Sequence, residues 1–380
     1  MVCRLKILWL LFLLLIITTL NLKAVNVIAN VNLQQEISVT TGAELDVKEL
    51  ILGHLADSYE WSIWSDGEKQ VSLSLPIILY SKNSGWHVFL SSRFEHGHSR
   101  YNGFYIATDG KYNGKIVEVD ETGSVERPLD LSLTKNAASL IINSLILSLI
   151  ILGVAKVMKR EPLKSHKGFA GLMEMFILAI EDEVIKATVG KDYKRYSPYL
   201  LTVFFFIFIN NLMGLMPFFP GGANVTGNIA VTFVLAISTF LAVNLTGSRA
   251  YYKEIFWPDV PTWLKVPFPL MPIIEVVGMF TKPFALMIRL FANIMAGHAI
   301  VLGLTCLVFV TVSLGPAINS SMTALSILFT VFINFVELLV AFIQAYVFTL
   351  LSAVFIGLAR DDQSTGSKKK LETVESKVQQ

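Results

Sequence analysis

The sequence predicts an all-α polytopic membrane protein with about five membrane segments, the last two forming a long, tilted antiparallel helical hairpin, and a small β-rich extramembrane domain at the N-terminus. Hydrophobic residues make up 53% of the 380 residues and charged residues only 16%, which is too apolar for an ordinary soluble protein. Five apolar stretches are long enough to cross a hydrocarbon core about 30 Å thick. The net charge of +2 gives no reason to expect nucleic acid as a partner.

Residues 1–29 have the layout of a signal peptide. Arg4 and Lys6 precede the apolar run "ILWLLFLLLII", and the small residues Ala24 and Ala29 follow it, as in secretory signals. An uncleaved anchor helix is the alternative, and the sequence leaves both readings open.

Residues 30–130 form the predicted exported domain. The short runs "VSLSLPIILY", "WHVFLSS" and "NGFYIAT" are separated by Gly, Ser and Asn, a pattern typical of short strands and turns. The domain contains four histidines, His54, His87, His96 and His98. Two loop histidines in "HGH" without a third ligand usually lie on a surface, so we expect no metal site. Cys3 lies in the N-terminal leader and Cys306 in an apolar span, so the two cysteines offer no pair for a structural disulfide.

Residues 131–358 form the predicted membrane domain. Its segments are expected at about 136–155, 199–219, 227–246, 267–312 and 322–358, with an amphipathic interface helix between the first two. Positive charge follows the first, third and fifth segments, in "KVMKREPLKSHK", "GSRAYYKE" and "KKK", whereas "FFPGGANVTGN" and "SLGPAINSS" carry none. The positive-inside rule therefore predicts a periplasmic N-terminal domain and a cytoplasmic tail at 359–380.

The last two segments are too long to stand upright in a bilayer. A straight helix of about 45 residues is roughly 67 Å long, about twice the hydrocarbon core. A matched pair of such helices predicts a strongly tilted hairpin, and the stretch near Pro316 offers its turn.

Polar residues in "FTKPFALMIRLFANIMAGHAI" fall on two sides of the fourth helix. Glu275, Lys282 and Arg289 are spaced by seven, which returns nearly to the same side, and Asn293 lies about 40° from Arg289. His298 is nine residues beyond Arg289, about 180° around the axis. Two separate polar environments are therefore expected.

The hairpin register pairs these residues with the returning helix. Arg289 lies 27 residues before Pro316 and Gln344 lies 28 after it. His298 lies 18 before the same proline and Glu337 lies 21 after it. We therefore predict Arg289 beside Gln344, and His298 beside Glu337, at about equal depth.

The two environments differ in chemistry. An arginine near the bilayer centre costs roughly 2.5–3.5 kcal/mol and stays protonated, so it is a fixed cation. An imidazole beside a carboxylate can gain and lose protons, as a proton relay needs. A purely structural contact between helices remains the alternative for His298 and Glu337, and snorkelling to an interface the alternative for Arg289.

At these residues the sequence resembles the subunit a family of the F-type ATP synthases. "KPFALMIRLFANIMAGH" is similar to the family signature, with Arg289 at its essential arginine. The resemblance extends to Glu275, to Asn293, to "FVELLVAFIQAY" and to "NNLMGLMP", where Asn211 fits, and it covers roughly residues 136–358.

The resemblance implies a stator subunit in the bacterial inner membrane that grips a rotating ring of c subunits, each with one membrane carboxylate. Arg289, positioned by Gln344, would keep passing carboxylates ionised and block a direct proton leak. His298, Glu337 and Asn211 would belong to an outer half-channel, and Glu275 to the cytoplasmic exit. The implied partners are the c ring, the b subunit of the peripheral stalk, the rest of the ATP synthase and the lipid bilayer. No cofactor and no catalysis of its own are implied, and no "GxxxxGK[ST]" loop is present.

Two positions depart from the common bacterial pattern. His298 and Glu337 are exchanged between the two helices, which the facing register makes tolerable, and Gly214 stands where some members carry an acid. A secondary transporter or channel is the main alternative, but it predicts inverted repeats that the sequence does not display. A membrane metalloenzyme fails because His298 is the only intramembrane histidine. Proton versus sodium coupling and ring size stay open.

Overall fold

The computed structural model describes most of the chain between residues 57 and 360. The described residues are 57–66, 69–82, 84–97, 99–108, 110–119, 125–160, 166–216, 220–257, 270–311 and 315–360. The predicted signal segment and nearly all of the predicted tail lie outside them.

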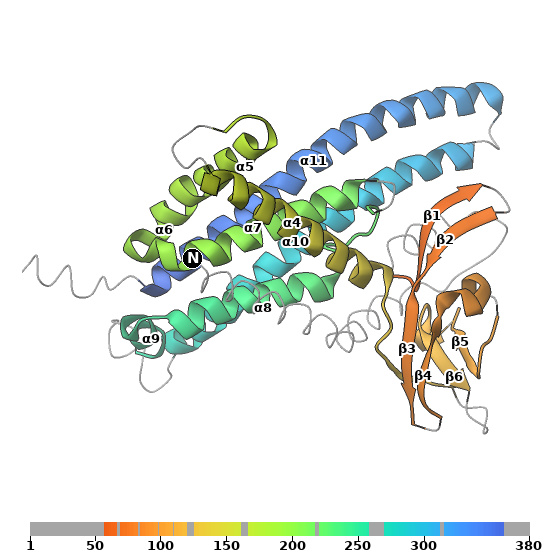
Figure 1. The fold of residues 1–380 in the computed structure, drawn as a ribbon, viewed down its shortest axis with the longest axis horizontal. Helices are drawn as coiled ribbons and strands as arrows, with labels where there is room; N and C mark the ends of the chain where they lie inside the picture. Colours follow the sequence, from red (N-terminus) through yellow and green to blue (C-terminus); the bar gives the residue numbers. More distant parts are fainter. Residues whose placement is uncertain are drawn as a thin grey trace, which may run out of the picture.

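The N-terminal part is a small β-rich domain (Figure 1). Its strands are β1 (Glu60–Asp66), β2 (Lys69–Ser74), β3 (Pro76–Ser81), β4 (Gly85–Leu90), β5 (Phe104–Ile106), β6 (Ile116–Val119), β7 (Val125–Glu126) and β8 (Leu129–Asp130). They form three antiparallel sheets, with the orders β1-β2, β4-β3-β8 and β5-β6-β7. The prediction of a β-rich domain is confirmed.

The core of this domain lies between the second and third sheets. Ile77 and Leu79 of β3 are fully buried and pack with Phe94, Phe104 and Ile116. Tyr59 closes the core by donating a hydrogen bond of 2.5 Å to Oδ2 of Asp130. Burial and this carboxylate raise the pKa of Tyr59 well above its usual value, because both disfavour the phenolate.

The domain is fastened to the first helix by main-chain hydrogen bonds. The amides of Leu131 and Leu133 donate to the carbonyls of Ile78 and Pro76, at 2.9 and 3.0 Å, so the chain follows β3 beyond β8. The Lys135 amide then donates to Ser58 O at 2.8 Å. The domain and the helix therefore share a rigid junction.

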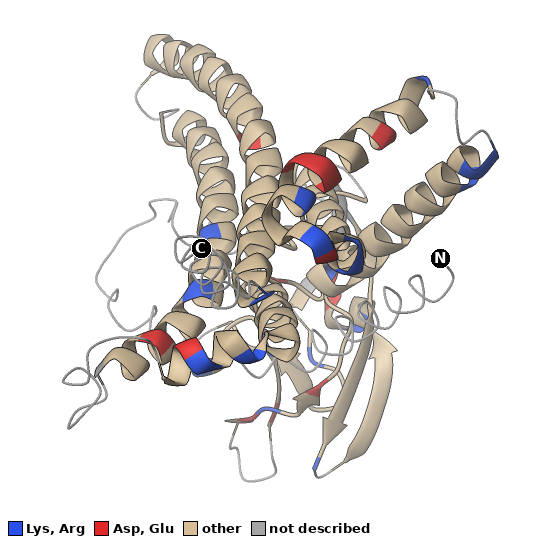
Figure 2. Cartoon of the chain, turned by 90° about the vertical axis from the view of Figure 1, so that its left-hand side faces the viewer, with Lys and Arg blue, Asp and Glu red and all other residues tan. Residues whose placement is uncertain are grey.

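The membrane part consists of helices that run side by side (Figure 1). They are α4 (Lys135–Arg160), α5 (Gly168–Ala179), the π-helix η4 (Ile180–Lys186), α6 (Ala187–Val189), α7 (Tyr193–Leu215), α8 (Ile229–Thr246), α9 (Arg249–Phe256), α10 (Leu270–Val310) and α11 (Pro316–Arg360). The described residues include five helical stretches apolar enough to span a membrane, as predicted. Figure 2 shows the charged residues gathered mainly toward helix ends and loops, with long uncharged stretches between them.

The helix boundaries differ from the predicted ones. α7 begins at Tyr193, six residues before the predicted start, and ends at Leu215. α11 begins at Pro316, because proline fits the first turn of a helix, where its missing N–H has no intrahelical partner. α10 and α11 contain 41 and 45 residues, so the overlong hairpin is confirmed.

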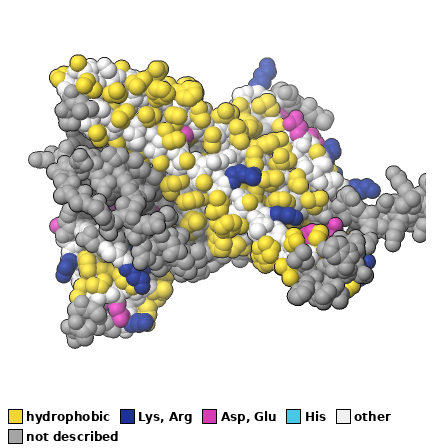
Figure 3. All heavy atoms as spheres, turned by 180° about the vertical axis from the view of Figure 1, so that it is seen from behind, with side chains coloured by type: hydrophobic (Ala, Val, Ile, Leu, Met, Phe, Trp, Pro, Cys, Tyr) yellow, Lys and Arg dark blue, Asp and Glu magenta, His cyan; other side chains and the backbone are white. Residues whose placement is uncertain are grey.

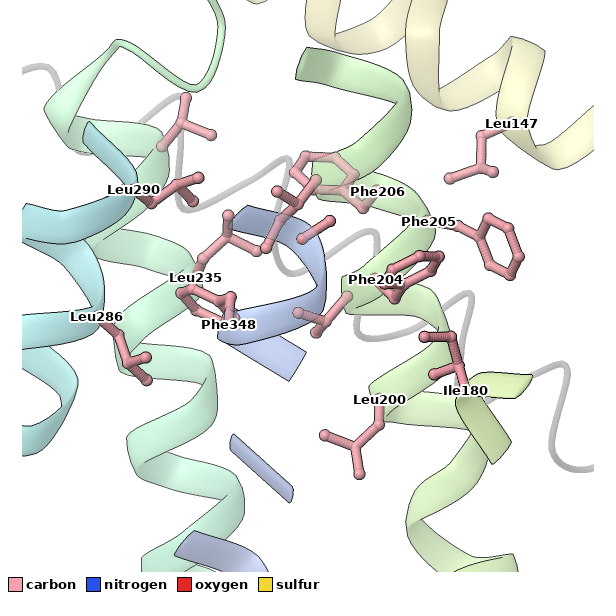
Figure 4. Close-up of a cluster of buried hydrophobic side chains, with 14 of the residues drawn as sticks. Leu147, Ile180, Leu200, Phe204, Phe205, Phe206, Leu235, Leu286, Leu290 and Phe348 are labelled. Atoms are coloured by element: carbon pink, nitrogen blue, oxygen red, sulfur yellow. The ribbon is translucent and has the colours of Figure 1, made fainter. Parts of the chain in front are cut away.

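Aromatic and aliphatic side chains fill the space where α7, α8, α10 and α11 meet. Figure 4 shows Phe204 and Phe206 of α7 beside Phe348 of α11, and Leu235 of α8 facing Leu286 and Leu290 of α10. All six side chains are buried. This cluster fixes α7 against α11 and orients one face of α10 inward.

The amphipathic prediction for α5 is only partly met. The apolar stripe that helical spacing predicts consists of Phe169, Leu172, Met173, Phe176 and Ile180, the last at the start of η4. Met173 and Ile180 are buried, but Phe169 and Leu172 are 58% and 45% exposed. Met175 and Leu178 are exposed too, so α5 is apolar on its outer side as well.

Candidate functional site

The α10–α11 hairpin has a register that can be read from its own hydrogen bonds. Near the turn, Thr311 Oγ1 donates to Asn319 Oδ1 at 3.0 Å. Farther from it, Ser326 Oγ donates to the Leu304 carbonyl at 2.6 Å. The two helices therefore run antiparallel in close contact.

His298 and Glu337 continue this register. Nδ1 of His298 lies 3.9 Å from Oε1 of Glu337, and the two side chains are 19% and 11% exposed. The structure thus brings together the pair that the sequence register predicts. At this distance the groups attract each other strongly when the histidine is protonated, and a small movement or one water molecule would join them.

Gly297 makes room for the Glu337 carboxylate. A Cβ atom at Gly297 would lie 2.3 Å from Oε1 of Glu337, closer than such atoms can approach, and 3.1 Å from its Cδ, which is a tight contact. Any larger residue would displace the carboxylate. The sequence signal was the glycine beside His298, but helix periodicity alone does not reveal that it faces α11.

Gly214 of α7 lies on the other side of His298. A Cβ atom at Gly214 would lie 3.7 Å from Nε2 of the histidine, in ordinary van der Waals contact. An acidic side chain at this position would reach the imidazole.

Asn211 joins α7 to α11 one turn beyond Glu337. Its Nδ2 donates to the Ala341 carbonyl at 3.2 Å, and its Oδ1 accepts from Thr226 Oγ1 at 2.6 Å. Asn211 and Thr226 are buried. The amide is therefore held on the side of α11 that also carries Glu337, and Thr226 is a partner that the sequence reading missed.

A second buried polar contact joins α4 to α7. Asn143 Nδ2 donates to Asn210 Oδ1 at 3.1 Å, and Asn143 Oδ1 has no hydrogen-bond partner within the described residues. The sequence did not predict this contact, because α4 and α7 are separated in the chain. An asparagine within an apolar stretch gives no sign of which helix it meets.

Arg289 lies on the opposite side of α10. Leu286 and Leu290 point into the bundle and are 2% and 1% exposed, whereas Arg289 is exposed. Within the described part of the chain, Arg289 makes no hydrogen bond or ion pair. Figure 3 shows isolated basic side chains within a broad apolar surface.

Asn293 and Lys282 are exposed like Arg289, and Glu275 is half-exposed. Gln344 is buried, at 8% exposure. From His298 to Arg289 is nine residues and from Glu337 to Gln344 is seven, so their depths differ by only about 3 Å. Direct contact between Arg289 and Gln344 stays a prediction.

A small pocket lies between the ends of α8, α9, α10 and α11 that are remote from the hairpin turn. Its lining includes Asn244, Tyr251 and Lys282, and the ammonium of Lys282 lies 5.7 Å from the centre of the Phe355 ring. Burial, followed by the nearby Tyr252 and Glu275, raises the pKa of Tyr251. Glu275 is therefore close enough to act on this pocket electrostatically.

The arrangement separates two kinds of chemistry on one helix. The His298 side is enclosed between α7 and α11 and contains an imidazole and a carboxylate, side chains that are able to gain and lose protons. The Arg289 side presents a permanent cation on an apolar surface that no described part of the chain covers. Such a cation suits an anionic partner that arrives within the membrane.

Comparisons with known proteins place the chain beside one family. The model of the family described as ATP synthase A chain matches residues 139–357, and a model described as a domain of unknown function (DUF8433) matches residues 50–136. ATP synthase subunit a of Chloroherpeton thalassium is 42% identical over 246 residues, which are 63% of this chain and 70% of that protein.

Two further relatives are similar to this chain to about the same extent. ATP synthase subunit a of Myxococcus xanthus is 41% identical over 245 residues, 62% of this chain and 76% of that protein. ATP synthase subunit a 2 of Chlorobaculum tepidum is 42% identical over 240 residues, 60% of this chain and 64% of that protein. The chain thus spans about two thirds to three quarters of the length of these relatives.

Proposed function

This chain belongs to the ATP synthase A chain family, and we propose how its membrane residues carry out the stator role. It is a multi-pass membrane protein and a non-catalytic subunit of the ATP synthase complex, where it takes part in proton translocation. A secondary transporter or channel is not favoured.

Arg289 acts on the carboxylates of a ring of c subunits. The observation that carries this proposal is an exposed, unpaired arginine on an apolar face within the described residues. A nearby cation favours the ionised carboxylate, so an arriving protonated group loses its proton there. The same charge repels protons and blocks a leak between the two sides.

His298, Glu337 and Asn211 carry protons between the outer side and the ring. Support comes from the 3.9 Å approach of His298 to Glu337 and from Asn211 on the adjoining turn of α11. Glu275 serves the cytoplasmic exit beside the pocket at Tyr251. Gln344 and Asn293 flank Arg289 and limit the positions that it and a passing carboxylate adopt.

The chain lies in the bacterial inner membrane with its β-rich domain in the periplasm and its C-terminus in the cytoplasm. The basic loops after the first, third and fifth spans support this orientation. The c ring covers the Arg289 side of α10, and the b subunit of the peripheral stalk holds the chain against rotation. The proposed division of the chain is the one that the sequence predicts, a signal peptide at 1–29, an exported domain at 30–130, a membrane domain at 131–358 and a tail at 359–380.

Replacement of Arg289 tests this function. We expect Arg289→Ala to abolish proton-driven ATP synthesis in inverted membrane vesicles while the chain stays in the membrane. Arg249→Ala, at an exposed arginine of α9, is the matched control and should keep normal synthesis. Normal synthesis by Arg289→Ala would refute the role given to Arg289.

A further inference from the structure

The sheet β4-β3-β8 has an apolar face that no described residue covers. We call it the apolar sheet face. It comprises Pro76, Ile78, Tyr80, Trp86, Val88, Leu90 and Leu129. The strand register sets Val88 opposite Ile78 and Trp86 opposite Tyr80, so the side chains form adjacent rows. Trp86 is 62% exposed and Val88 70%.

This exposure is unusual because the other face of the same sheet is already a complete core. Alternate residues of β3, Ile77 and Leu79, are fully buried, as expected where one face packs and the other meets water. Here the second face is apolar as well, and none of its seven residues is charged. Contiguous exposed apolar surface of this kind marks a contact with another phase or molecule.

The junction with α4 fixes this face at the membrane boundary. The chain runs from Leu129 along β3 through two amide hydrogen bonds and enters α4 at Lys135. Asn136 N also donates to Asp57 Oδ1 at 3.1 Å. α4 is long and apolar enough to span the membrane, so these hydrogen bonds hold the sheet near the level where the first helix would enter the bilayer.

The direction of the face follows from the two cartoons. In Figure 1, β3 and β4 run across the direction of the long helices, and β5 and β6 lie on the side away from those helices. The core joins β3 to β5 and β6, so the apolar sheet face looks back toward the membrane. Figure 2, seen from the helical end, shows strands of this domain below the helices.

We propose that the apolar sheet face rests on the outer surface of the bilayer, with its side chains at the boundary between lipid headgroups and acyl chains. Tryptophan and tyrosine favour this zone, because their rings are amphipathic. The face carries both, together with aliphatic side chains of a size that reaches the acyl region. The domain thereby braces α4, which packs against α7, against tilting.

Site-directed spin labelling tests the contact. The full chain, with Cys3 and Cys306 replaced by serine, carries one label at Val88→Cys and is placed in lipid nanodiscs. We expect the label to be more accessible to oxygen and several-fold less accessible to a water-soluble nickel complex than a label at Lys111→Cys. Lys111 is exposed on the connection between β5 and β6 and is the matched control.

Two outcomes would overturn the proposal. Equal access of the nickel complex to both labels would show that the face stays in water. Shielding of Val88→Cys from both oxygen and nickel would show that protein covers it, either another segment of this chain or a partner. If the label disturbs the fold, quenching of Trp86 fluorescence by lipids brominated near the headgroup gives the same answer, with Trp86→Phe identifying its contribution.

Discussion

The α10–α11 hairpin and the α7–α8 pair are both apolar helices, but they use their surfaces in opposite ways. Within the most apolar stretches, 44% of residues are buried on the segment ending in α7 and on α8, against 6% on α10 and 17% on α11. α7 buries Phe204 and Phe206, while the hairpin exposes Phe284, Phe332 and Phe335. The first region holds the subunit together, and the second is a surface that meets other molecules.

The two regions also differ in how their polar side chains are held. In the α7–α8 region, buried polar side chains are held by specific hydrogen bonds, such as that from Thr226 to Asn211. On the hairpin, Arg289 has no such partner within the described residues, and Nδ1 of His298 lies 3.9 Å from Oε1 of Glu337, beyond hydrogen-bond distance. Groups that must change partners or protonation state during a cycle cannot be locked in permanent bonds.

Among changes around the His298–Glu337 pair, the largest expected effect comes from filling the space at Gly297. Gly297→Ala places a methyl group where the Glu337 carboxylate lies, so the carboxylate has to move away from His298. We expect passive proton conduction through the membrane sector to fall by about tenfold or more, as when a proton-transfer group is misplaced.

Gly303→Ala is the matched control, because it lies on the same helix and a Cβ atom there meets nothing within 4 Å. Equal conduction by the two variants would show that the position of the Glu337 carboxylate is unimportant, and the outer pathway would then need other residues.

A smaller effect is expected when His298 and Glu337 exchange places. The single changes His298→Glu and Glu337→His each leave two like groups facing each other, whereas the double variant restores one imidazole and one carboxylate. We expect the double variant to support more ATP synthesis than either single variant. If it is no better than the singles, the two groups do not act as a facing pair.

Much of this could be predicted from the sequence. The span number, the overlong hairpin and the pairing of His298 with Glu337 follow from apolar length, helix geometry and one turn near Pro316. What the sequence could not give is contact between helices far apart in the chain, such as Asn143 with Asn210 or Gly214 with His298. Periodicity defines the faces of one helix but not the neighbour that each face meets.

In the β-rich domain, too, the sequence alone does not show which face of a strand is buried. "PIILY" and "WHVFL" are apolar at nearly every position, so alternation cannot distinguish the face that packs in the core from the face that looks outward. Only the partner sheet decides, because Phe104 and Ile116 cover Ile77 and Leu79 and leave Val88 exposed.

The smallest effects on proton transport are expected from truncating aromatic side chains. These truncations distinguish the two regions by how much each lowers the free energy of unfolding. Phe204→Ala removes a fully buried ring from the α7 core and should lower the free energy of unfolding by about 3–5 kcal/mol. Phe335→Ala removes a ring that is 70% exposed on α11 and should change it by less than about 0.5 kcal/mol in the isolated chain. Denaturation of the purified chain in mixed micelles measures both. Because Phe335 is exposed on the hairpin surface, its loss should instead weaken contact with neighbouring subunits, seen as less chain co-purifying with the complete complex. Equal destabilisation by the two variants would mean that the hairpin packs within the chain as tightly as α7 does, and its role as a contact surface would be lost.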